Sequence, residues 1–193
     1  MNKTAPIALA ACLLGPATSI ASSGHEEAIA ALAMEKIKPW LNNPVLVASL
    51  RDQNARHASI SQADIDRLDQ QWRTESAAAN RPLIDSLLGN TLSSELQRFK
   101  SSAQGLYTEI FVMDAHGLNV GQSDVTSDYW QGDEAKWQKT FLLGPDAIHV
   151  GDIEHDESSQ MFQSQVSLSV VDPASSDVLG AITVGINVDL ALQ

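Results

Sequence analysis

The sequence predicts an α+β domain in which an N-terminal helical part, residues 23–104, packs on one face of a five-stranded antiparallel sheet formed by residues 105–193. Before Gly105, apolar residues recur at the three- and four-residue spacing that is typical of helices. From Leu106 onward, apolar and polar residues alternate, which is typical of half-buried strands. No internal repeat, low-complexity tract or Gly/Ser linker separates the two parts, so we expect a single domain.

Local start and stop signals divide the helical part into several helices. The Asn43-Pro44 pair supplies an N-cap and a first-turn proline. Ser61 with Asp64 three residues later resembles a capping box, and the Arg81-Pro82 pair ends the helix that follows it. Strands are predicted at residues 107–113, 118–123, 147–153, 162–171 and 178–188. Between the second and third strands, the polar and aromatic stretch 127–139 predicts a loop with a short helix.

The first 22 residues have the layout of a secretory signal peptide. Lys3 precedes an uncharged run to Leu14, and small residues follow it. We therefore expect a periplasmic or secreted protein, with no membrane insertion, since the run is shorter than the ~20 apolar residues that span a bilayer. Residues 9–12 also spell a lipoprotein-like box, but the apolar run before Cys12 is too short for that signal.

Negative charge is concentrated in the predicted sheet part. The chain carries a net charge of -12, and residues 105–193 hold fourteen acidic side chains but only two basic ones, Lys136 and Lys139. Such a surface repels phosphate backbones, so we expect no nucleic-acid partner. It favours cations, amines or a basic partner, and a surface that only confers solubility explains it equally well.

The predicted strands have one apolar face and one polar face. In the fourth strand, Val166 and Leu168 alternate with Ser167 and Ser169, and Thr183 lies on the polar side of the last strand. We expect the helices to cover the apolar face. The polar face has the composition of a pocket with a few convergent polar groups.

The stretch between the second and third strands is the predicted cover of that pocket. It combines aromatic side chains with carboxylates, which together hold cationic or amine-bearing molecules. Asp128 is the expected charged anchor of this site. The complete predicted set of ligand-binding residues is Tyr107, Glu109, Asp128, Tyr129, Trp130, Trp137, Ser167 and Thr183. An alternative is that the aromatic residues only fill a core that the sheet leaves open.

Signals for catalysis and for cofactors are absent from the sequence. It has no Gly-x-Ser-x-Gly elbow, no His-Glu-x-x-His motif and no glycine-rich phosphate loop, so we expect a protein that is not an enzyme and uses no cofactor. Asp152, Glu154 and Asp156 are weak metal-ligand candidates because strand alternation puts them on one side. Their surroundings do not match a calcium loop, and an exposed acidic hairpin is the preferred interpretation.

Three segments resemble the single-Cache sensor domains, which are PAS-like modules outside the cytoplasmic membrane. They are Glu109–Asp114 with Gly117, the stretch Ser127–Trp130, and Val171–Pro173 followed by Val178–Gly185. The resemblance implies a small-molecule ligand, amine- or carboxylate-bearing, held between the sheet and its cover. It also implies a signal passed to a partner protein, a membrane receptor or a kinase. The chain lacks the arginine-and-tyrosine signature of the amino-acid-binding branch.

Two function hypotheses follow from these observations. The first is an exported small-molecule-binding sensor of Cache type that signals through a partner. The second is a structural or interaction protein whose acidic half docks a basic partner.

Overall fold

The computed structural model describes residues 20–156 and 161–193. The expected signal peptide lies outside the described residues except for residues 20–22, which begin the first helix. Among the described residues, no helix has the length and apolar composition needed to span a membrane.

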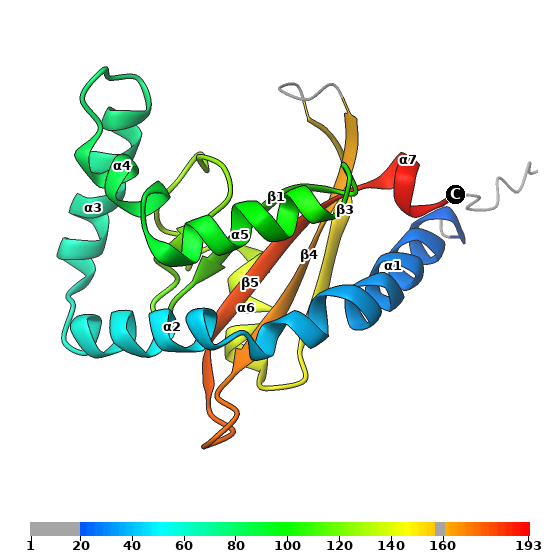
Figure 1. The fold of residues 1–193 in the computed structure, drawn as a ribbon, viewed down its shortest axis with the longest axis horizontal. Helices are drawn as coiled ribbons and strands as arrows, with labels where there is room; N and C mark the ends of the chain where they lie inside the picture. The colour runs from blue at the N-terminus through cyan, green and yellow to red at the C-terminus, as the bar shows by residue number, and fades with distance from the viewer. Residues whose placement is uncertain (1–19, 157–160) are drawn as a thin grey trace, which may run out of the picture.

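A five-stranded antiparallel sheet forms the centre of the molecule (Figure 1), as the sequence predicted. Its strands are β1 Tyr107–Met113, β2 Asn119–Gln122, β3 Ile148–Asp156, β4 Met161–Val171 and β5 Val178–Asn187. They are arranged in the order β2-β1-β5-β4-β3, so the first and last strands pair at the centre. This order, with helices before and within the sheet, gives an α+β fold of the PAS-like kind.

Two of the helices, α2 and α3, begin at the capping residues that the sequence indicates. The helical elements are α1 Ile20–Leu32, α2 Pro44–His57, α3 Gln62–Ser76, α4 Pro82–Leu88, α5 Thr91–Ser102, α6 Ala135–Gln138 and α7 Val188–Ala191. A π-helical turn, Ala33–Ile37, and two 3-10 turns, Lys38–Asn42 and Phe141–Leu143, complete them. The Asn43 side chain accepts hydrogen bonds from the first turn of α2, and the Ser61 hydroxyl accepts one from the Asp64 backbone N–H.

The main core lies between the apolar face of the sheet and helices α1, α2 and α5 (Figure 1). Val166, Leu168 and Val184 from the central strands are buried here against Leu50 of α2 and Leu96 of α5. The helices therefore cover the face that strand alternation identified as apolar.

A second core lies beyond the β2 edge of the sheet, where α3 and α4 pack together. Trp72 of α3 is fully buried there and stacks on Tyr129, with 5.4 Å between the ring centroids. Leu118 and Leu87 complete the contact. The segment around Tyr129 thus packs on helices α3 and α4, which together form a helical extension of the domain.

An ion pair joins α2 to the turn between β4 and β5. Arg51 donates to both carboxylate oxygens of Asp172, at 2.6 Å and 2.5 Å. The hydrogen bonds from Arg51 and from the Ala174 backbone N–H lower the pKa of Asp172 from 3.8 to about 2.

We expect Asp172 to stabilise the fold above pH 4 and to lose this contribution as the pH falls toward 2. The folded pKa lies below the unfolded one, so protonation favours the unfolded chain. Thermal unfolding of the wild type and of Asp172→Asn between pH 2 and 6 measures this effect. The difference between their melting temperatures should shrink with falling pH, and a constant difference would contradict the assignment.

Candidate functional site

A cavity of about 460 Å³ lies on the polar side of the sheet, between strands β3 and β4 and helix α6. α6 packs on the face of β3, β4 and β5 opposite the long helices (Figure 1). The cavity is lined by Glu26, Glu134, Ala135, Lys136, Lys139, His149, Val150, Gly151, Asp152, Gln165 and Ser167. It therefore occupies the face that the sequence predicted to hold a pocket.

Polar side chains of the central strands form and support the floor of this cavity. The hydroxyls of Ser167 and Thr183 are buried and hydrogen-bonded to each other at 2.9 Å. Beside them, the Gln165 amide donates to the Glu109 carboxylate at 2.8 Å. The small serine and threonine side chains leave space above the sheet, and the hydrogen bonds between these groups offset the cost of their burial.

Both of the basic residues in the C-terminal half lie at this cavity. Lys136 Nζ is 2.8 Å from Glu134 and lies 5.4 Å from the centre of the Phe111 ring. Lys139 is exposed at the rim. A cavity with two ammonium groups beside carboxylates can bind carboxylate and amino groups through charge-assisted hydrogen bonds.

His149 of β3 lines the same cavity. Burial and the nearby positive charge of Lys139 lower its pKa, and the carboxylates of Glu26 and Asp152 oppose that shift. The dominant effect of burial favours the neutral imidazole, which has one nitrogen to donate and one to accept.

Trp137, predicted as a wall of the pocket, packs against Phe111 and Met113 but is not one of the residues that line the cavity. Its ring stacks on Phe141 with 5.0 Å between centroids, and its indole N–H donates to the Asp114 carbonyl oxygen at 3.0 Å. These contacts hold α6 against the sheet, so Trp137 fixes the position of the helix that covers the cavity.

The remaining predicted cover residues lie elsewhere, because the segment around Asp128 packs against α3. The Asp69 carboxylate accepts hydrogen bonds from the backbone N–H groups of Tyr129 and Trp130, at 3.0 and 3.1 Å. Arg73 of α3 pairs with Asp128 at 2.9 Å. The expectation that Asp128, Tyr129 and Trp130 face Ser167 and Thr183 is therefore wrong.

The expected position of Tyr107 is also wrong. The register of β1 against β5 shifts between Tyr107 and Glu109. This irregularity reverses the side of the sheet on which Tyr107 lies, and its ring is buried in the main core against Phe99. Glu109, after the shift, lies beside Gln165 as predicted.

Sequence reasoning missed five charged or titratable residues of the cavity: Glu26, Glu134, Lys136, Lys139 and His149. Lys136 and Lys139 are the two basic residues among fourteen acidic ones in residues 105–193, and this contrast could have marked them as candidate site residues. No comparable signal exists for Glu26, because α1 and β3 meet only in the folded chain.

The acidic candidates of the β3–β4 hairpin are not gathered into a metal site among the described residues. Asp152 and Glu154 are exposed, and the side chain of Asp156 lies outside the described part. The interpretation as an exposed hairpin stays a prediction.

The strand order and the helices on both faces of the sheet define an α+β domain of the PAS-like kind, with an open cavity beside α6. No protein-family model matches the sequence, and no curated protein matches it. Among solved structures, the chain is similar to ligand-binding domains of chemoreceptors and to the sensor domain of a histidine kinase.

Three of these structures illustrate the likeness. The ligand-binding domain of the Campylobacter jejuni chemoreceptor Tlp3, in complex with 4-methylisoleucine, is 12% identical with a TM-score of 0.41, over 80% of this chain and 61% of that chain. The sensor domain of the V. cholerae histidine kinase DctB is 16% identical with a TM-score of 0.38, over 77% and 60%. The ligand-binding domain of the Pseudomonas aeruginosa chemoreceptor PctC, in complex with GABA, is 16% identical with a TM-score of 0.37, over 84% and 60%. This chain thus spans about three fifths of each of them.

Proposed function

We propose that this protein is a small-molecule-binding sensor module whose ligand lies in the cavity between the sheet and α6. The observation that carries the proposal is a space of about 460 Å³ over the polar sheet face. Its volume is in the range of ligand pockets, about 300–1,000 Å³. A sheet face that served only as core would be closed by apolar side chains instead.

The charges around the cavity indicate the chemistry of the ligand. Lys136 and Lys139 can bind a carboxylate, while Glu26, Glu134 and Asp152 can bind an amino group. A small polar molecule with an amino group, a carboxylate or both suits this arrangement. Lys136 takes the place that the sequence had given to Asp128 as the charged anchor.

The setting of this sensor is part of the same proposal. The signal-like start of the sequence supports export to the periplasm or the medium. A module without catalytic groups transmits a signal by binding a partner, and a membrane receptor or kinase is the proposed partner. Binding without chemical conversion of the ligand is the proposed activity.

Thermal-shift measurements with amino acids, carboxylates and polyamines test the proposal. A ligand that binds only the native state at a hundred times its dissociation constant adds about 2.7 kcal/mol of stability, which raises the melting temperature. For a carboxylate-bearing hit, we expect Lys136→Gln to weaken binding about tenfold to a hundredfold, because a hydrogen bond to a charged group is lost. For an amine-bearing hit, Asp152→Asn should have the corresponding effect.

Lys100→Gln is the matched control. Lys100 lies on α5 and pairs with Asp124 away from the cavity, so its removal should leave the affinity unchanged. A screen without hits, or hits whose affinity both cavity variants leave intact, would contradict the proposed site. Stabilisation by basic polypeptides alone would favour the interaction-protein hypothesis.

A further inference from the structure

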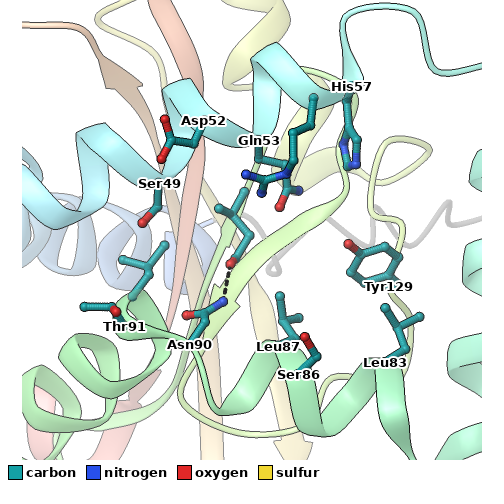
Figure 2. A pocket seen from close by; sticks show the side chains of 13 residues that line it. Ser49, Asp52, Gln53, His57, Leu83, Ser86, Leu87, Asn90, Thr91 and Tyr129 are labelled. Atoms are coloured by element: carbon teal, nitrogen blue, oxygen red, sulfur yellow. Dashed lines mark hydrogen bonds between the residues drawn. The ribbon is translucent and has the colours of Figure 1, made fainter.

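A second cavity, of about 410 Å³, lies on the helical side of the molecule and is unrelated to the space under α6. It is a cleft between α2 and the α4–α5 corner, and Figure 2 shows that the side chains of Asp52, His57, Leu83 and Tyr129 surround it. It lies where the main core meets the second core, because Leu92 of the former and Leu87 of the latter both line it.

The Tyr129 hydroxyl is directed into this cleft (Figure 2). Most of the side chain is buried, but the hydroxyl oxygen is not one of the fully buried polar atoms and forms no hydrogen bond to the described residues, so it is accessible from the cleft. Burial and the negative charge of Asp114 raise the pKa of Tyr129 to about 12, so the hydroxyl keeps its proton at neutral pH. Water can solvate this hydroxyl in the cleft, and an acceptor atom of a bound ligand can replace that water.

Arg56 of α2 lines the same cleft and has no ion-pair partner among the described residues. Its positive charge lowers the pKa of Tyr129, but the larger effects of burial and of Asp114 raise it. Next to it, the His57 ring is held by Asp114, 2.8 Å from its Nδ1 atom. An exposed guanidinium and a protonated phenol thus both line the cleft, and both groups can donate hydrogen bonds to a ligand.

The remaining lining limits the size and charge of a ligand. Leu83 and Leu87 supply apolar surface beside Tyr129, which suits a short aliphatic chain. Asp52 lies on the opposite side of the cleft from Tyr129 (Figure 2), so a second negative charge on the ligand would be repelled there.

We propose that this cleft is a second ligand site, which binds a short aliphatic monocarboxylate through the Arg56 guanidinium and the Tyr129 hydroxyl. The carboxylate accepts hydrogen bonds from both groups, and the chain of the ligand contacts Leu83 and Leu87. Because Tyr129 is in the core that holds α3 and α4, occupancy of this site would stabilise the helical extension.

Butyrate, succinate and n-butylamine are the probes, and amide chemical shifts of the full chain are the readout. We expect saturable binding of butyrate with shifts on α2 and α4, weaker binding of succinate and none of n-butylamine. Tyr129→Phe and Arg56→Gln should each weaken butyrate binding about tenfold or more, since each removes a hydrogen bond to a charged group. Tyr129→Phe should leave the melting temperature of the free protein unchanged, because the ring stays and the hydroxyl has no partner in the described chain.

Arg67→Gln is the control, because Arg67 is an exposed arginine of α3 that is paired with Asp64. It should bind butyrate as the wild type does. The proposal is overturned if butyrate does not bind, if its shifts fall on β3 and β4, if n-butylamine or succinate binds as well as butyrate, or if affinity survives both cleft variants. Arg56 and Tyr129 do not line the sheet-side cavity, so a failure of this proposal does not contradict the proposed function of that cavity.

Discussion

Replacing Asp114 by alanine is expected to lower the free energy of unfolding by about 3 to 5 kcal/mol. The carboxylate is fully buried at the end of β1. One oxygen accepts from the backbone N–H groups of His116 and Leu118, at 2.8 and 3.0 Å, and so fixes the turn to β2. The other lies 3.0 Å from the Gln53 amide and 2.8 Å from the His57 ring, and so fixes α2. Alanine leaves the His116 and Leu118 N–H groups without this acceptor, while the Gln53 amide keeps its bonds to the carbonyl oxygens of Leu118 and Asn119. Each buried donor without a partner costs about 1 to 3 kcal/mol.

Urea unfolding of the wild type and three variants measures this effect. Asp114→Asn should cost less than alanine, because its carbonyl oxygen still accepts the two turn hydrogen bonds. Asp124→Ala is the control, since Asp124 is exposed and pairs with Lys100 at the surface, and it should change the stability by about 1 kcal/mol or less. An Asp114→Ala variant as stable as this control would show that the buried network does not hold α2 to the sheet.

The parts of the fold that the sequence predicted depend on local signals. Asn43 and Ser61 cap helices because their side chains bond to backbone groups two or three residues away. β1 has the predicted limits, Tyr107–Met113, since alternation and the turn at Asp114 are both readable along the chain. The polar and apolar faces of β4 follow from the two-residue period in the same way.

The errors concern features that depend on distant contacts. The register shift next to Thr108 is fixed by pairing with β5, and nothing near Tyr107 in the sequence indicates it. Asp69, on α3, binds the backbone of the Tyr129 segment and draws it off the sheet face. Glu75 on the same helix accepts hydrogen bonds from the backbone N–H groups at the start of α4.

Helix α3 therefore decides where the predicted cover segment lies. Its buried carboxylates, Asp69 and Glu75, bind backbone groups that are between eight and about sixty residues away in the sequence. In a sequence they are indistinguishable from the solvated acids of an amphipathic helix. As a result, the residues predicted to form one site lie apart: Trp137 is beside the sheet-side cavity, and Tyr129 lines the cleft between α2 and α4.

Replacing Trp72 by alanine is expected to lower the free energy of unfolding by about 3 to 5 kcal/mol, the usual cost of removing a large aromatic side chain from a core. Trp72 is 0% exposed, stacks on Tyr129 and donates its indole N–H to the Thr126 carbonyl oxygen at 2.9 Å. The substitution leaves a cavity between α3, α4 and the Tyr129 segment. Urea unfolding of the variant and of the wild type measures this difference in the free energy of unfolding.

Trp72→Phe keeps an aromatic ring against Tyr129 but loses the bond to Thr126 and part of the buried volume. Its cost should be smaller than that of Trp72→Ala. Trp40→Ala is the control for tryptophan removal as such, since Trp40 is only partly buried, on Phe99 of the main core. If Trp72→Ala costs no more than Trp40→Ala, the second core contributes little to stability. In that case the Tyr129 segment must be held mainly by its bonds to Asp69 and Arg73.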